Sequence, residues 1–283
     1  MTTPDVEYPE LPARTAILAG SGRLPEIISA ELAAAKRAPY VIAVTDDVGN
    51  WVAQHDHSYV PVTHLSAILR TLKSAAVQTV VLAGGIKVRP RLTSFKFDWM
   101  TIKQLPRLAR ALRHGDDGLL SEAIGWLQSC GFTVVGAQDL VPALLAPIGE
   151  VTLLGPHDND QYDIESAIYE SRRLGADDIG QAAVARGGAI VASEGRSGTK
   201  AMLMQLAASE QRFRRSGVLA KFSKPQQELR VDLPTIGPDT VEQAAAAGLA
   251  GIVVEAGRSL ILDREFTVAK ANDLGIFIVG MRG

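Results

Sequence analysis

The stretch TAILAGSGRLPEIISAELAAAKRA, residues 15–38, decides the fold of the first half of the chain. Its first five residues are a short apolar run that predicts a buried strand, and the glycines at 20 and 22 predict a turn. Apolar residues at helical spacing follow, with Pro25 in the first turn, where its missing N–H costs nothing. The stretch therefore predicts a β-loop-α unit.

The same pattern recurs further along the chain. The apolar runs YVIAVT (40–45), TVVLAGG (79–85) and FTVVGA (132–137) alternate with predicted helices over 65–75, 103–113 and 119–130. Because these runs are apolar throughout, they are typical of strands in a parallel sheet covered on both faces. Residues 1–145 are predicted to form a Rossmann-like domain.

A second α/β domain is predicted over residues 146–283. Pro142, Pro147 and Pro156 lie in a stretch of little periodicity, which marks the domain boundary. Beyond it, predicted helices over 163–174, 200–208, 241–247 and 264–274 alternate with apolar runs at 189–192, 217–223, 251–257, 259–263 and 275–281. Antiparallel pairing is expected across the short connection EAGRS (255–259).

Composition excludes several classes of protein. The chain has 283 residues, 47% hydrophobic and 21% charged, with a formal net charge of -2, so it is globular and offers no basic field for nucleic acid. Cys130 is the single cysteine, which excludes an internal disulfide and a cysteine-based zinc site. The polar first 14 residues and the absence of an 18-residue apolar run predict a cytoplasmic protein without a signal peptide or transmembrane helix.

Glycine-containing turns follow three of the predicted strands, at the edge where such sheets bind ligands. Backbone N–H groups and a helix N-terminus there could hold a phosphate, although the turns could equally be structural. The spacing is not G-x-G-x-x-G, so classical NAD binding is disfavoured. The candidate substrate-binding residues at this edge are Gly20, Ser21, Gly22, Leu24, Pro25, Gly84, Gly85, Lys87 and Gly136.

Two further helix starts carry polar residues. Asp116 and Asp117 are either a helix cap or contacts to magnesium or a substrate ribose. Thr199 and Lys200 follow a glycine-bearing loop, where phosphate oxygens would be favoured and where Lys200 could equally be solvated. The five histidines show no metal-binding spacing, and no G-x-S-x-G motif is present, so zinc and serine hydrolases lose support.

The densest polar segment is KFSKPQQELRVDLPTIG, residues 221–237. Its prolines predict a long loop held in an extended path, and long loops in compact domains are usually functional. Its cations suit a diphosphate, and Asp232 could orient water or bind a metal, although a solvated surface loop is the alternative. The candidates for substrate binding are Lys221, Lys224, Gln227, Arg230 and Thr235.

Six stretches together resemble the LpxI family, the UDP-2,3-diacylglucosamine pyrophosphatases of lipid A biosynthesis. They are AGSGRLP (19–25), HGDDGLL (114–120), DIGQAAVARGG (178–188), GTKAML (198–203), KPQQELRVDLPTIG (224–237) and AAAAGLAGIVVEAGRSLILDRE (244–265). The resemblance runs from about Thr15 to the carboxyl end. It implies magnesium-dependent hydrolysis of UDP-2,3-diacylglucosamine to UMP and 2,3-diacylglucosamine 1-phosphate (lipid X) in a Gram-negative bacterium.

The resemblance also assigns roles to individual residues. The aspartate of the family's R-V-D-L-P stretch, critical for catalysis, falls on Asp232, which also becomes the candidate magnesium ligand. Where the family reads G-T-D-A-M-L, this chain has Lys200. An ammonium in place of that carboxylate would repel a metal and attract the pyrophosphate, so substrate binding with poor turnover is predicted.

Three hypotheses follow from these residues. The leading one is the pyrophosphatase, implied to be a homodimer of two-domain subunits that touches the inner membrane peripherally because its substrate is diacylated. The second is a catalytically impaired protein that binds the UDP-sugar lipid, favoured by Lys200. The third is a nicotinamide-dependent oxidoreductase, suggested only by the Rossmann-like half.

Overall fold

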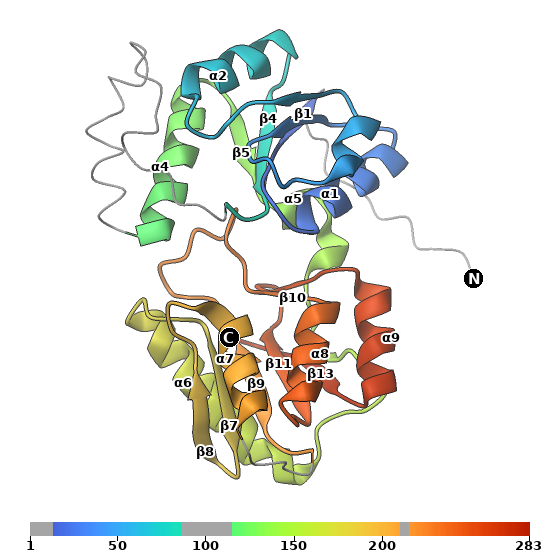
Figure 1. Ribbon diagram of the computed structural model, residues 1–283, viewed down its shortest axis with the longest axis vertical. Coiled ribbons are helices and arrows are strands. Elements are labelled where there is room, and N and C mark those ends of the chain that lie inside the picture. Colours follow the sequence, from blue (N-terminus) through green and yellow to red (C-terminus); the bar gives the residue numbers. More distant parts are fainter. Residues whose placement is uncertain (1–13, 87–114, 210–214) are drawn as a thin grey trace. The chain divides into compact units, whose positions relative to one another are not determined.

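The structure is a computed structural model that describes residues 14–86, 115–209 and 215–283 (Figure 1). The chain divides into two compact units. The first unit contains the described residues up to Pro142 together with Glu228–Asp232, and the second contains Ala143–Gln227 and Leu233–Gly283 without the undescribed gap. The helix expected over 103–113 lies outside the described residues.

The first unit contains a parallel five-stranded sheet in the order β3-β2-β1-β4-β5. This order confirms the predicted Rossmann-like fold, whose ligand edge lies at the carboxyl ends of β1 and β4, where the strand order reverses. The strands are β1 (Thr15–Ala19), β2 (Tyr40–Ala43), β3 (His57–Tyr59), β4 (Thr79–Ala83) and β5 (Thr133–Val135). The helices are α1 (Leu24–Ala34), α2 (Leu65–Ser74), α4 (Gly115–Ser129) and α5 (Ala137–Leu140), with the 3-10 helix η1 (Asn50–Gln54).

Helices cover both faces of this sheet. On one face, Leu18 of β1 joins a buried cluster with Leu72 of α2 and Leu127 of α4. On the other face, α1 contacts β1 and α5 contacts β4. The apolar strands are therefore covered by helices on both faces. Burial of each leucine side chain contributes roughly 1.5–3 kcal/mol to the free energy of unfolding.

The second unit contains a mixed six-stranded sheet in the order β6-β13-β11-β9-β7-β8. Its three middle strands β13, β11 and β9 are parallel, while β6 and β7 run antiparallel to their neighbours, which confirms the predicted α/β class. The strands are β6 (Gly149–Glu150), β7 (Ala182–Arg186), β8 (Ala189–Ser193), β9 (Val218–Lys221), β11 (Gly251–Glu255) and β13 (Phe277–Met281). The helices are α6 (Gln161–Ala176), α7 (Gly198–Ala208), α8 (Pro238–Ala246) and α9 (Arg264–Leu274), with the 3-10 helices η3 (Pro142–Leu144) and η4 (Asp158–Asp160).

The antiparallel pairing expected across residues 255–259 was wrong. Both edges of β11 are already occupied, by β9 on one side and β13 on the other. The turn at Gly257, with φ of +70°, leads out of the sheet, and β12 (Leu260–Ile261) pairs in parallel with β10 (Thr235–Ile236) as a separate two-stranded sheet. The sequence reading also missed β7, whose alanines gave a weak strand signal.

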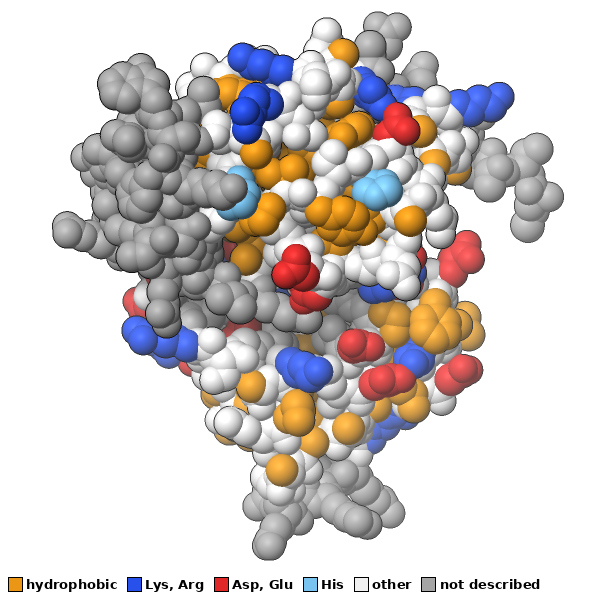
Figure 2. Space-filling view, turned by 45° about the horizontal axis from the view of Figure 1, so that its top comes forward, with side chains coloured by type: hydrophobic (Ala, Val, Ile, Leu, Met, Phe, Trp, Pro, Cys, Tyr) orange, Lys and Arg blue, Asp and Glu red, His pale blue; other side chains and the backbone are white. Residues whose placement is uncertain are grey.

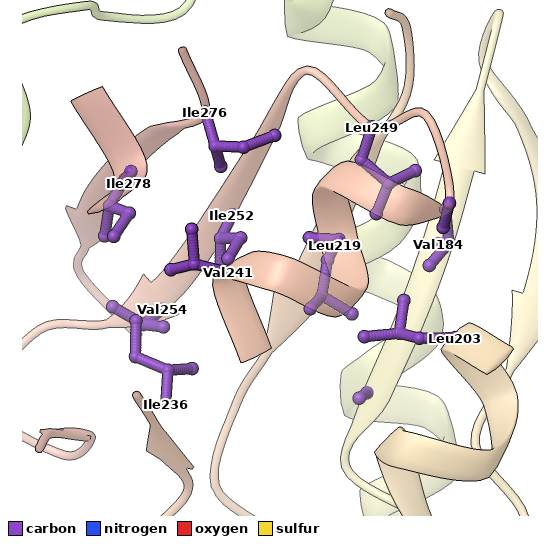
Figure 3. Close-up of a cluster of buried hydrophobic side chains, with 14 of the residues drawn as sticks. Val184, Leu203, Leu219, Ile236, Val241, Leu249, Ile252, Val254, Ile276 and Ile278 are labelled. Carbon is purple, nitrogen blue, oxygen red and sulfur yellow. The ribbon is translucent and has the colours of Figure 1, made fainter. Parts of the chain in front are cut away.

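Figure 3 shows the larger core cluster of the second unit. Leu219 of β9 and Ile252 of β11 point to the same face and pack with Leu203 of α7 and Val241 of α8. The alternate residue Val253 joins a cluster with α6 on the opposite face of the sheet. The two-residue period of a strand thus supplies both cores from the same apolar runs.

The segment Glu228–Asp232 leaves the second unit and belongs to the first. It is not the extended path that the prolines suggested, because it folds into a turn in which Val231 and Asp232 donate their backbone N–H groups to the Glu228 carbonyl, at 3.0 and 3.1 Å. The partly buried Val231 packs against the core cluster of the first unit. Apolar burial and local turn formation therefore place these five residues.

Two loops at the carboxyl edge of the first sheet are joined by their backbones. Ser21 and Gly85 exchange N–H···O bonds of 2.8 and 2.9 Å, and the Ser21 hydroxyl also donates to the Gly85 carbonyl at 2.9 Å. Gly84 has φ of +87°, and a Cβ there would lie 2.6 Å from the Ser21 carbonyl oxygen. The approach of the two backbones requires glycine at this position.

We expect Gly84→Ala to lower the free energy of unfolding of the first unit by more than about 2 kcal/mol, because backbone strain and a backbone collision add. Gly22→Ala is the matched control: its φ is +100°, yet an added Cβ meets nothing within 4 Å, so only the strain of about 1–2 kcal/mol remains. All three tryptophans, Trp51, Trp99 and Trp126, precede Pro142, so fluorescence during urea unfolding reports on the first unit. Equal effects of the two substitutions would contradict the expectation.

Candidate active site

The glycine loops of the first unit provide fewer anion donors than their sequence suggested. Ser21 and Gly85 direct their backbone N–H groups at each other, and Gly20 donates to the Ala83 carbonyl at 2.8 Å. These three groups hold the loops together and are not available to a phosphate. The following residues lead into α1.

The first turn of α1 is the remaining anion-binding feature at this edge. Gly22 is exposed and leaves open space beside it, and Leu24 and Pro25 are the first two residues of the helix. Arg23, directly before the helix, forms an ion pair with Glu26 in the first turn, with Nη1 and Oε2 2.5 Å apart. A helix N-terminus and a nearby guanidinium both favour an anion, while Glu26 competes with it.

Gly136 lies at the end of β5 and has a packing role. It is buried, and its N–H donates to the Asp139 carboxylate at 2.7 Å, which caps α5. A Cβ at this position would collide with the side-chain amide of Gln138. Gln138 Nε2 in turn donates to the Leu229 carbonyl at 3.1 Å, so the end of β5 holds the segment that carries Asp232.

Arg230 pairs first with an acid of its own turn. Its Nε and Nη2 donate to the two carboxylate oxygens of Glu228 at 2.9 and 2.8 Å. This bidentate bond raises the pKa of Arg230 and lowers the pKa of Glu228, with Asp139 adding a weaker attraction on Arg230. Both groups are charged at neutral pH, and the pair stiffens the turn that ends at Asp232.

Three of the candidate residues flanking this turn lie in the second unit and have partners there. Lys221 Nζ donates to the Thr235 carbonyl at 2.9 Å, and Lys224 Nζ lies 2.8 Å from Asp178. Thr235 donates its hydroxyl to the Leu233 carbonyl at 2.9 Å. A diphosphate bound by the lysines would therefore share them with these oxygens.

Gln227 closes a turn at the edge of the second sheet. It is buried, its Oε1 accepts from the Lys224 N–H at 3.0 Å, and its Nε2 donates to Gln181 Oε1 at 3.3 Å. These bonds use its side chain within the protein. Gln227 therefore stabilises the backbone of the loop that carries Lys224.

The structure adds two buried acids that the sequence reading missed. Glu194 directly follows β8 and accepts from the Gln181 N–H and the Thr199 hydroxyl, both at 2.9 Å. Glu255 ends β11 and accepts from the N–H and hydroxyl of Ser223. A buried carboxylate requires such donors. An acid at the end of an apolar run was the signal that could have found both.

Thr199 and Lys200 lie in the first turn of α7. The Thr199 hydroxyl is bonded to Glu194, whereas the side chain of Lys200 is exposed. A cation in the first turn of a helix is unfavourable by itself, because the N-terminus carries partial positive charge. The combination makes this turn attractive to an anionic ligand and unattractive to a metal.

The remaining candidates are only partly described. Lys87 lies outside the described residues, and for Asp116 and Asp117 the structure describes the backbone alone, as the first turn of α4. Among the described side chains, no group of three or more His, Cys, Asp or Glu residues could hold a metal ion. The role of Asp232 as a magnesium ligand stays a prediction; Mg²⁺ commonly binds through one or two carboxylates together with substrate phosphates.

The surface carries charges of both signs, as the formal net charge of -2 indicates (Figure 2). On the face shown in Figure 2, acidic and basic side chains are interspersed with hydrophobic ones. No helix in the described ranges is long and apolar enough to cross a membrane.

Comparison with known proteins identifies the family. The model of the LpxI N-terminal domain matches residues 14–144, and that of the LpxI C-terminal domain matches residues 147–279. The UDP-2,3-diacylglucosamine pyrophosphatase LpxI of Caulobacter vibrioides is 37% identical over 270 residues, which cover 94% of this chain and 96% of the relative. The turn that carries Asp232 lies within the second match in sequence but within the first unit in space. This chain belongs to the LpxI family.

Proposed function

We propose that this chain hydrolyses the pyrophosphate bond of UDP-2,3-diacylglucosamine to UMP and 2,3-diacylglucosamine 1-phosphate (lipid X), with Mg²⁺ assisting. The observation that carries the proposal is Asp232, the last residue of a turn anchored at the carboxyl edge of a Rossmann-like sheet. The relative that is 37% identical to this chain is named a UDP-2,3-diacylglucosamine pyrophosphatase. An acid held at the ligand edge of such a sheet suits the chemistry of a nucleotide-linked substrate.

The reaction requires little from the protein beyond positioning and charge. A water oxygen attacks one phosphorus, the bond from that phosphorus to the bridging oxygen breaks, and attack at either phosphorus yields the same two products. Asp232 orients the water and accepts its proton, since a carboxylate is an acceptor at neutral pH. Mg²⁺, when bound, would neutralise charge on the phosphoryl oxygens.

Two helix N-termini suit the anionic substrate. The N-terminus of α1 begins at Leu24, and the N-terminus of α7 carries Lys200 in its first turn. The lysines at 221 and 224 supply positive charge at the edge of the second sheet. The proposal includes a cytoplasmic homodimer that touches the inner membrane, both expectations resting on the family and on the diacylated substrate.

We expect Asp232→Asn to lower kcat for UMP release by about 10²- to 10⁴-fold, because the amide cannot accept the proton of the attacking water. Binding of the substrate should persist, as measured by equilibrium dialysis with radiolabelled UDP-2,3-diacylglucosamine. Asp273→Asn, at an exposed position in α9, is the matched control and should retain full activity. Undiminished turnover by the Asp232 variant would refute its assigned role.

We expect chelation of divalent cations to abolish UMP release and added Mg²⁺ to restore it. The described side chains form no protein cage of three ligands, so the ion should bind far more tightly in the presence of substrate. Isothermal titration with Mg²⁺, with and without a non-hydrolysable analogue of the substrate, measures this difference. Full activity in excess chelator would remove magnesium from the proposal.

Lys200 favours a second candidate function, a homologue that binds the UDP-sugar lipid and turns it over poorly. We expect Lys200→Asp to raise kcat and to weaken substrate binding, because a carboxylate attracts the metal and repels the pyrophosphate. Lys200→Asn serves as the control, because asparagine has nearly the same shape as aspartate but carries no charge. Equal rates of UMP release by the unaltered chain and Lys200→Asp would exclude this candidate and leave the first one standing.

A further inference from the structure

The side chain of Gln138, in the short helix α5 that follows β5, bonds to the turn that carries Asp232. Its amide donates to the Leu229 carbonyl at 3.1 Å, across 91 positions of sequence. Both residues belong to the first unit, although Leu229 lies within the sequence of the C-terminal family domain. Within the turn, the side chain of Arg230 bonds to that of Glu228.

Gly136 makes room for this link. Its φ is -84°, which any residue adopts, so conformational freedom does not explain the glycine. A Cβ at this position would instead collide with Nε2, Oε1 and Cδ of Gln138. The side-chain amide lies over the bare backbone of Gly136, and any larger residue would push it away from the Leu229 carbonyl.

We propose that Gly136 and Gln138 form a positioning device that holds Asp232 in its catalytic place through the Leu229 carbonyl. This rests on the proposed function, in which Asp232 accepts the proton of the attacking water. The Leu229 carbonyl is held from outside the turn, and the Glu228 carbonyl is held within it by the N–H groups of Val231 and Asp232. Val231 anchors the same turn in the core of the first unit.

The link acts on orientation more than on binding. Val231 continues to keep the segment on the first unit when Gln138 is altered, so the substrate-binding surfaces elsewhere are unaffected. One lost hydrogen bond multiplies the population of misplaced turn by about 3- to 10-fold. A small displacement of an acceptor from the attacking water lowers kcat while leaving KM almost unchanged.

The test compares Gln138→Leu and Gln138→Glu with the unaltered chain. Neither variant can donate to the Leu229 carbonyl, and the second keeps the shape of the side chain. We expect the backbone amides of Val231 and Asp232 to exchange hydrogen about 3- to 10-fold faster in both variants. We also expect kcat for UMP release to fall measurably while KM stays within about twofold. Gln138→Lys restores a donor and should recover most of both readouts.

Gly136→Ala provides an independent test. It should reproduce the loss of kcat, and adding Gln138→Leu to it should cost little more, because both changes remove the same bond. Gln128→Leu, at an exposed position near the end of α4, is the control for replacing a surface glutamine with leucine and should leave kcat and exchange unaltered.

The outcomes separate the two proposals. If the unaltered chain releases no UMP, the proposed function fails, while hydrogen exchange still reports on the link. If the Gln138 variants exchange faster at Val231 and Asp232 but keep full kcat, the link is structural only and the positioning role is overturned. Unaltered exchange, or fully additive losses with Gly136→Ala, would overturn it as well.

Discussion

The packing of the partly buried Val231 against the core of the first unit is the constraint on which the arrangement of the candidate site depends. This one side chain belongs by sequence to the C-terminal family domain, and its packing draws residues 228–232 out of the second unit. The chain therefore passes between the units at Pro142, at Gln227 and again after Asp232. The candidate catalytic acid belongs to the first unit, and its neighbours in sequence on either side of the turn belong to the second.

Hydrogen bonds on either side of this turn explain the composition of the segment. Glu228 and Arg230 satisfy each other, and Leu229 is held by Gln138. In the second unit, Lys221 and Lys224 bond to a carbonyl and to a carboxylate. The cations that look like free phosphate ligands in the sequence are thus part of a network. In the proposed function, a diphosphate would share these cations with their present partners.

The same balance applies to the glycine loops. A bound phosphate accepts hydrogen bonds from N–H groups, but the N–H groups of Ser21 and Gly85 donate to each other's carbonyl and join the two loops. What this gives the site is rigidity, since the first turn of α1 follows a loop that is fixed at both sides. Gly84 and Gly136 are each required by a close approach, one of backbone and one of a side-chain amide. The glycine at each of these two positions is explained by packing, without a contact to a ligand.

The sequence by itself determined the α/β class, the two-unit plan and four of the five strands of the Rossmann-like half, because these follow from apolar periodicity and from turn residues that act locally. It did not give β3 (His57–Tyr59), whose residues are mostly polar. It also determined the family, because RVDLPTIG and its companion motifs are local strings. Only the tertiary structure decided that β12 pairs with β10, that Glu194 and Glu255 are buried acids, and that Asp232 belongs to the first unit. These depend on contacts between residues far apart in sequence, such as Gln138 with Leu229, and no local periodicity encodes which distant carbonyl an amide will reach.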